Sequence, residues 1–104
     1  MSNNRIELLE GMVAQNPDDS RTRYMLAMEL AKSGNLVGAV EHYEAILEKT
    51  PDYIPAYFHC GQTLERLDQP ADARRVYQKG IEACTRSGDL KTRGELEEAL
   101  SALG

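Results

Sequence analysis

The residues of this sequence that could do chemistry are two cysteines, two histidines and a few grouped carboxylates. Catalysis needs a nucleophile beside a base, a cluster of metal ligands or a pair of tuned carboxylates. His59 and Cys60 are adjacent, but neighbours on a helix point about 100° apart, so these side chains cannot bind one metal ion. Cys84 falls at the end of an expected helix and has no catalytic context. Neither cysteine therefore indicates a metal site or a nucleophile.

The acidic groups have simpler explanations than catalysis. Asp18 and Asp19 precede an expected helix, where a carboxylate caps free backbone N–H groups. Glu95, Glu97 and Glu98 are typical of a solvated helix face. The glycines are scattered at helix ends and form no phosphate-binding loop. The sequence therefore predicts no catalytic residue, no cofactor and no metal site.

Length and charge restrict the class of protein. The chain has 104 residues, of which 41% are hydrophobic and 28% charged, as in an ordinary globular domain. Its net charge of -5 disfavours binding to nucleic acid or to anionic lipid. No apolar run reaches the length of about 18 residues that a membrane-spanning helix needs. We expect neither nucleic acid nor membrane as a partner.

The sequence also suggests a compartment. Residues 1–5 lack the apolar centre of a signal peptide. Cys60 and Cys84 are too few and too far apart for a metal knuckle or a redox pair, and they agree with a reducing compartment. We therefore expect the protein in the cytoplasm.

One segment departs from the acidic balance of the chain. Residues 74–93 carry six basic and two acidic side chains, which are Arg74, Arg75, Lys79, Arg86, Lys91 and Arg93 against Glu82 and Asp89. We expect a solvated helix face here. The alternative is a patch that binds an acidic partner.

Apolar residues recur with helical spacing, and no stretch alternates with the period of two that a strand requires. Asp19 or Ser20 can cap one helix, Gly34 suits the left-handed position that ends it, and Asn35 can cap the next. Prolines stand where their missing N–H costs nothing, in the first turns of later helices. The pattern predicts six helices, near residues 4–16, 20–33, 36–49, 54–67, 70–84 and 90–103.

The sequence overlays itself when it is shifted by 34 residues. Tyr43 then falls on Tyr77, and Ala39 falls on Ala73. Matched size and polarity at a fixed period indicate a stacked structural unit. The small residues of the pattern allow two helices to approach closely, while the aromatic residues fill the adjacent holes.

These residues resemble the tetratricopeptide repeat (TPR), whose pattern is an aromatic, Leu-Gly, Tyr, Ala, Phe and Pro at fixed offsets. The first copy reads Arg23, Leu26, Ala27, Leu30, Ala39, Tyr43 and Pro51, and the second reads Tyr57, Cys60, Gly61, Leu64, Ala73, Tyr77 and Thr85. The departures are Arg23 for the aromatic, Cys60 for Leu and Thr85 for Pro. Cys60 stands at the buried Leu position of the family, which implies a core thiol.

The resemblance implies an all-α fold, a right-handed superhelix of antiparallel helix pairs. It spans nearly all of residues 1–104 as a single domain. Residues 4–17 match the second half of a preceding repeat, 20–53 and 54–87 are two full repeats, and 88–103 form a capping helix. Leu96, Leu100 and Leu103 of that helix should cover the apolar face of helix 70–84.

The resemblance also implies a function, which is the capture of a peptide or partner protein in a concave groove lined by the first helix of each repeat. That face maps to Arg21, Tyr24, Met25, Met28 and Lys32 in the first copy and to Pro55, Phe58, His59, Gln62 and Arg66 in the second. The apolar members could instead pack partly beneath neighbouring helices. The alternative function is structural self-association without a peptide ligand.

The groove residues also suggest what the partner is. The basic side chains Arg21, Lys32 and Arg66 outnumber Glu65, which favours apolar anchors with some acidic character. Some members of the family grip acidic chaperone tails with Lys and Asn, but Tyr24, Met28 and His59 occupy the matching slots here, so we expect no such binding. Polar residues on both end helices favour a monomer or at most a weak dimer.

Overall fold

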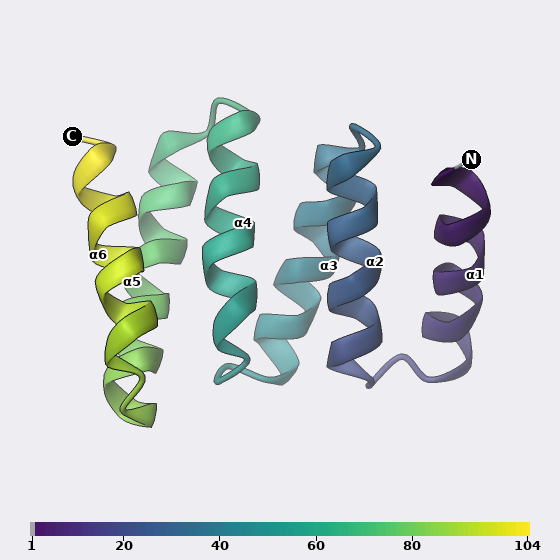
Figure 1. The fold of residues 1–104 in the computed structure, drawn as a ribbon, viewed down its shortest axis with the longest axis horizontal. Coiled ribbons are helices and arrows are strands. Elements are labelled where there is room, and N and C mark those ends of the chain that lie inside the picture. Colours follow the sequence, from purple (N-terminus) through teal and green to yellow (C-terminus); the bar gives the residue numbers. More distant parts are fainter. Residues whose placement is uncertain (1) are drawn as a thin grey trace.

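The computed structural model describes the backbone of residues 2–104 and the side chains of residues 4–104. Within this part of the chain all regular structure is α-helical, as predicted (Figure 1). The helices are α1 (Ser2–Gln15), α2 (Ser20–Lys32), α3 (Leu36–Lys49), α4 (Ile54–Arg66), α5 (Pro70–Ser87) and α6 (Leu90–Ala102).

The six helices form a row of antiparallel neighbours. Each helix packs against the next one along the chain, and α2 also contacts α4 directly. Figure 1 shows α2, α4 and α6 in front, with α3 and α5 behind them, while α1 and α6 close the two ends of the row. Side chains of α2, α4 and α6 therefore share one face of the molecule, and the core lies between the two layers.

The helix ends follow the expected local chemistry. Asp19 caps α2, where its carboxylate accepts hydrogen bonds from the backbone N–H and the hydroxyl of Thr22. Asn35 caps α3 by accepting from the N–H of Gly38 at 2.9 Å. Gly34, between these two helices, has a φ of 96°, a left-handed conformation that glycine adopts without steric cost. The predicted turn between α2 and α3 is confirmed.

Helix α5 is longer than predicted. The sequence suggested an end near Cys84, but the helix continues to Ser87 and stops at Gly88, which has a φ of 80°. In the preceding repeat, the second helix is α3, which ends at Lys49, shortly before Pro51. The matching position in the next repeat holds Thr85, which, unlike proline, can be part of a helix. The missing proline therefore lengthens this helix, while α6 begins at Leu90, as predicted.

Small residues allow the close helix contacts that the repeat pattern predicted. Ala39 and Ala73 are fully buried, and a Cβ atom on Gly61 would collide with the ring of Tyr77. A Cβ atom on Gly80 would lie 2.9 Å from Cδ1 of Leu96, so α6 also packs closely on α5. The predicted cover of α5 by the last helix is confirmed at this contact.

The prediction that polar residues cover both ends is wrong for α1. Leu8 is 65% exposed and Met12 is 43% exposed on this helix. The matching residues 34 positions later are His42 and Ile46 of α3, and both are covered by other helices. His42 contacts Arg23 of α2, and Ile46 is buried. Helix α1 has no such helix on its outer side among the described residues (Figure 1).

Candidate functional site

The structure brings the nine predicted groove residues together on the side of the molecule formed by α2, α4 and α6, which we call the α2/α4/α6 face. The charged and amide side chains at its edges are exposed, and the apolar and aromatic ones are half-buried against the core. The exposed members are Arg21, Lys32, Gln62 and Arg66, and the half-buried ones are Tyr24, Met25, Met28, Phe58 and His59. The face therefore combines an apolar middle with polar edges.

Tyr24 is the centre of an aromatic cluster on this face. Its ring centroid lies 5.4 Å from that of Tyr53, 6.0 Å from Tyr43 and 5.7 Å from His59. The ring of Phe58 meets His59 edge to face at 5.7 Å. Such pairs stabilise the fold beyond their buried area. These side chains hold α2, α3 and α4 together as well as lining the face.

The middle of the face is electrically neutral at physiological pH. Burial lowers the pKa of His59 below its usual value, so its imidazole stays uncharged. Burial also raises the pKa of Tyr24, and the neighbouring Tyr53 adds to this effect. Charge therefore enters this face only from its edges.

Helix α6 contributes residues to the face that the sequence did not place there. A hollow of about 350 Å³ lies between α4 and α6, and its lining is Phe58, Gln62, Glu65, Tyr77, Glu95, Glu98, Ala99 and Ala102. The cap residues of α2, α4 and α6 are Asp19, Tyr53 and Asp89, which are spaced by 34 and then 36 residues. A strict 34-residue alignment therefore misplaces every side chain of α6.

These additions change the expected charge of the site. The sequence predicted an excess of basic residues and hence a partner with acidic character. Glu65, Glu95 and Glu98 give the face three carboxylates and Arg21, Lys32 and Arg66 give it three basic side chains, of which Arg66 lies beside Glu65 on α4. Arg21 and Lys32 lie on α2, whereas Glu65, Glu95 and Glu98 surround the α4/α6 hollow.

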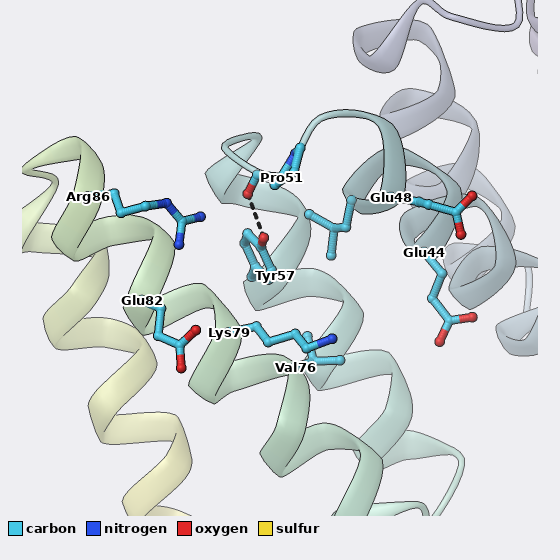
Figure 2. A pocket seen from close by; sticks show the side chains of 9 residues that line it. Glu44, Glu48, Pro51, Tyr57, Val76, Lys79, Glu82 and Arg86 are labelled. Carbon is cyan, nitrogen blue, oxygen red and sulfur yellow. Dashed lines mark hydrogen bonds between the residues drawn. The ribbon is translucent and has the colours of Figure 1, made fainter.

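A larger hollow of about 470 Å³ lies on the other layer, between α3 and α5 (Figure 2). It is lined by Glu44, Leu47, Glu48, Pro51, Tyr57, Val76, Lys79, Glu82 and Arg86. Figure 2 shows Lys79 and Arg86 extending from α5, with Glu44 and Glu48 on α3. Both signs of charge are therefore mixed at this rim, which does not favour one kind of partner.

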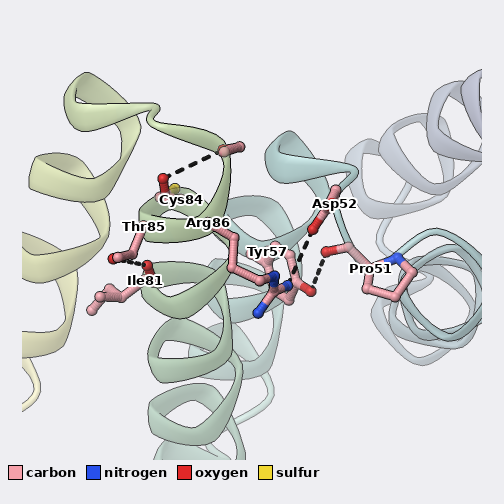
Figure 3. Close-up of polar contacts among 8 residues, drawn as sticks. Pro51, Asp52, Tyr57, Ile81, Cys84, Thr85 and Arg86 are labelled. Atoms are coloured by element: carbon pink, nitrogen blue, oxygen red, sulfur yellow. Dashed lines mark hydrogen bonds and ion pairs between the residues drawn. The ribbon is translucent and has the colours of Figure 1, made fainter.

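Polar contacts at one end of the α3/α5 hollow join α5 to the turn before α4 (Figure 3). The hydroxyl of Tyr57 donates to the carbonyl oxygen of Pro51 at 2.5 Å, and Nη2 of Arg86 lies 3.1 Å from Oδ1 of Asp52. Within α5, the hydroxyl of Thr85 donates to the carbonyl oxygen of Ile81. The polar side chains of Tyr57, Thr85 and Arg86 therefore have structural partners within the fold.

The basic segment 74–93 does not form one patch. Arg75 pairs with Asp72, Arg86 with Asp52 and Arg93 with Glu97. Arg74 donates to the carbonyl oxygen of Gly104, so four of the six cations already contact an acceptor. These contacts agree better with the expected solvated helix face than with a patch that binds an acidic partner.

The candidate chemical residues are mostly buried or engaged in structure. Cys60 and Cys84 are fully buried, and burial raises the pKa of the Cys60 thiol to about 12, far from a reactive thiolate. Of the two aspartates before α2, Asp19 caps the helix and Asp18 pairs with Lys49 at 2.5 Å. Among the described residues no three His, Cys, Asp or Glu side chains are grouped so that they could hold a metal ion.

In the part of the chain that the structure describes, no helix is both long enough and apolar enough to cross a membrane.

Comparison with known proteins identifies the fold. The family model of the tetratricopeptide repeat matches residues 30–83. A TPR repeat-containing protein of Pseudomonas aeruginosa is 26% identical over 98 residues, which cover 94% of this chain and 93% of that protein.

Solved structures agree with this match. The solution structure of a tetratricopeptide repeat domain protein from Salinibacter ruber is 39% identical, with a TM-score of 0.80 over 85% of this chain and 89% of that one. A protein of Bordetella parapertussis is 32% identical, with a TM-score of 0.79 over 94% of this chain and 85% of that one. Members of this family generally bind other proteins and act as non-catalytic scaffolds. From its repeat pattern, its six helices and these likenesses, we conclude that the chain belongs to the tetratricopeptide-repeat family.

Proposed function

We propose that this protein is a non-catalytic interaction module that binds a segment of a partner protein on the α2/α4/α6 face. The observation that carries the proposal is the strip of half-buried apolar side chains in the middle of that face. Tyr24, Met28 and Phe58 remain partly accessible, whereas Leu26 and Cys60 on the same two helices are fully buried. A contiguous accessible apolar surface with a polar rim is typical of a binding site.

The chemistry of the strip suits a peptide. Met25 and Met28 are flexible and polarizable, so they can adapt to differently shaped apolar side chains. Phe58 is the aromatic residue best placed to act as an anchor, because it also lines the α4/α6 hollow. The two buried free thiols agree with a reducing compartment, and we keep the cytoplasm as the proposed location.

The test compares two matched substitutions, one on the α2/α4/α6 face and one outside both hollows. Gln62 and Gln78 are both exposed glutamines within helices, but Gln62 lies on the α2/α4/α6 face and Gln78 lines neither hollow. Gln62→Arg should obstruct the groove, while Gln78→Arg adds the same charge and bulk elsewhere. The wild type and both variants would be used to capture proteins from the source cells, with quantification by mass spectrometry.

The proposal expects a set of partners that Gln62→Arg loses and Gln78→Arg keeps. Equal melting temperatures of the three proteins would show that folding is not the cause. Partners that both variants capture as well as the wild type would place the binding surface elsewhere and reject the groove.

A second candidate function is self-association through the outer face of α1. Leu8 and Met12 are exposed there one helical turn apart, and exposed apolar side chains of this size favour a protein interface. Sedimentation equilibrium of the wild type should then show a dimer that Leu8→Glu dissociates. A wild type that stays monomeric at about 0.5 mM, where even a weak dimer of millimolar dissociation constant becomes detectable, would exclude this function.

A further inference from the structure

The hollow between α4 and α6 has an apolar floor. The half-buried side chain of Phe58 and the small side chains of Ala99 and Ala102 line it, together with the ring of Tyr77. Its volume of about 350 Å³ is within the range of about 300–1,000 Å³ that is usual for ligand sites. The floor can therefore accept an aliphatic or aromatic group from a bound segment.

The rim of the same hollow is acidic. Glu65, Glu95 and Glu98 are all exposed at it, and none of the three makes an ion pair among the described residues. Glu65 is held in place because its Oε2 accepts the hydroxyl proton of Tyr77 at 2.5 Å. Two helices thus direct carboxylates at one apolar hollow.

The basic residues around this hollow do not neutralise it. Arg93 pairs with Glu97 at 3.2 Å, and Arg74 donates to the carbonyl oxygen of Gly104. Lys91 lies one turn before Glu95 but makes no ion pair with it. Arg66 lines a neighbouring shallow hollow with Gln62 and Glu65, so it lies on the Glu65 side of the site and not beside Glu95 and Glu98. A cation supplied by a partner therefore meets Glu95 and Glu98, which make no side-chain hydrogen bond or ion pair among the described residues.

We propose that the α4/α6 hollow binds a lysine or arginine side chain of the partner segment, next to an apolar residue of that segment. This inference rests on the proposed function of the α2/α4/α6 face. The aliphatic stem of the basic side chain lies over Phe58 and Ala99, and its charged end reaches Glu95 and Glu98. Long basic side chains combine an apolar stem with a cationic end, which matches this floor and rim.

Other occupants fit the hollow less well. A purely apolar side chain would remove water from Glu95 and Glu98 without pairing them, which costs free energy. An acidic side chain would be repelled by all three carboxylates of the rim. On α2, Lys32 pairs with Glu29 at 3.9 Å, but Arg21 makes no ion pair among the described residues, so it favours an acidic residue of the same segment at the other side of the face. The bound segment therefore has a direction, with its basic residue over α6 and its acidic residue over α2.

The test uses a library of random twelve-residue peptides displayed on phage, selected on the immobilised full chain. Enriched peptides are synthesised and titrated against three proteins, which are the wild type, a Glu95→Gln/Glu98→Gln variant and a Glu7→Gln/Glu10→Gln variant. The last variant is the matched control, because Glu7 and Glu10 are also exposed glutamates three residues apart, on α1. Gln62→Arg is included to identify peptides that bind the face at all.

The inference expects enriched peptides with a lysine or arginine within about two residues of an apolar side chain. Their affinity should fall at least tenfold in Glu95→Gln/Glu98→Gln and remain within twofold in the α1 control. Replacing the basic residue of the peptide by norleucine, which keeps the aliphatic stem, should weaken wild-type binding by a similar factor and leave binding to Glu95→Gln/Glu98→Gln unchanged.

Other results separate this inference from the proposed function. Peptides that Gln62→Arg abolishes but that are indifferent to Glu95→Gln/Glu98→Gln would overturn the basic-residue site and leave groove binding intact. Peptides indifferent to both changes would overturn the two together, and so would a selection that enriches no peptide.

Discussion

Arg23 and Tyr57 stand 34 residues apart and make the same hydrogen bond, in which each side chain donates to the carbonyl oxygen of the proline six residues before it. Nη2 of Arg23 lies 2.9 Å from the oxygen of Pro17, and the hydroxyl of Tyr57 lies 2.5 Å from the oxygen of Pro51. Arg23 departs from the aromatic residue of the family, yet its guanidinium reproduces the contact. It also reaches Nδ1 of His42 at 3.0 Å.

This equivalence predicts that both donors stabilise the turn before their helix. Tyr57→Phe removes only the hydroxyl and should lower the free energy of unfolding by about 0.5–1.5 kcal/mol. Arg23→Met keeps the aliphatic stem and should cost a similar amount, about 1 kcal/mol, because it loses the exposed hydrogen bond to Pro17 and the partly buried one to His42. Urea denaturation followed by circular dichroism measures both. If both variants unfold at the wild-type midpoint, the hydrogen bonds contribute nothing to stability.

Gly61 in α4 and Gly94 in the capping helix α6 should respond oppositely to substitution by alanine. A Cβ atom on Gly61 meets the ring of Tyr77, whereas one on Gly94 has no neighbour within 4 Å. Gly61→Ala should therefore destabilise the protein by about 1–3 kcal/mol through overpacking. Gly94→Ala should stabilise it by about 0.5–1 kcal/mol, since alanine is the better helix former.

Thermal unfolding of the two glycine variants checks this contrast. Ala27 stands at the matching position of the preceding repeat and is fully buried there. The fold therefore tolerates an alanine at this position of a repeat, and Gly61→Ala should still fold. A Gly61→Ala protein more stable than the wild type would show that the helices separate without cost.

Leu96 and Leu90 provide a matched pair on α6. Leu96 is fully buried against α5, while Leu90 is 71% exposed. Leu96→Ala should cost about 2–5 kcal/mol because it leaves a cavity in the core. Leu90→Ala should change stability by at most about 0.5 kcal/mol. Equal losses in a chemical denaturation series would mean that α6 does not cap the repeat through Leu96.

The two histidines predict a dependence of stability on pH. Burial lowers the pKa of both His59 and His42 in the folded protein, and Arg23 lowers that of His42 further. The unfolded chain therefore binds more protons than the folded one as the pH falls through about 6.5, so stability decreases on acidification. The free energy of unfolding should fall between pH 8 and pH 5.

The controls for this prediction are His59→Gln and His42→Gln. Each should remove part of the decrease in the free energy of unfolding between pH 8 and pH 5, and the double variant should remove most of it. Asp19 does not interfere, because its pKa is lowered from 3.8 by hydrogen bonds to Thr22 and its effect lies below this range. An unchanged decrease in the double variant would assign the pH dependence to other groups.

An acidic chaperone tail should bind weakly. Tyr24, Met28 and His59 stand where clamp-type members of the family carry Lys and Asn, and Glu95 and Glu98 add repulsion from α6. Titration with a synthetic acidic C-terminal peptide should give a dissociation constant above about 100 μM, which is a binding free energy of less than about 5.5 kcal/mol in magnitude. Submicromolar binding would contradict the prediction.

Much of this fold could be predicted from the sequence because it depends on local rules. The caps at Asp19 and Asn35 and the left-handed Gly34 act within about one helical turn, so single residues indicate them. The 34-residue pattern is also visible in the sequence, because matching residues recur at a fixed period. The burial of Cys60 and the close contact at Gly61 also followed, because small or apolar residues recur at fixed places in the repeat. The nine groove residues were placed on one face for the same reason.

Only the tertiary structure decided which side chains meet across helices. The predicted helices near 54–67 and 90–103 already start 36 residues apart, as α4 and α6 do, which is two residues more than the 34-residue period, but the sequence did not assign the side chains of the last helix to a face. Each residue turns a helix by about 100°, and a shift of two residues therefore redirects every side chain of α6. That shift places Glu95 and Glu98 beside Phe58 and makes the end of the face acidic. The sequence carries both glutamates, but only the packing of α6 against α5 decides which face they join.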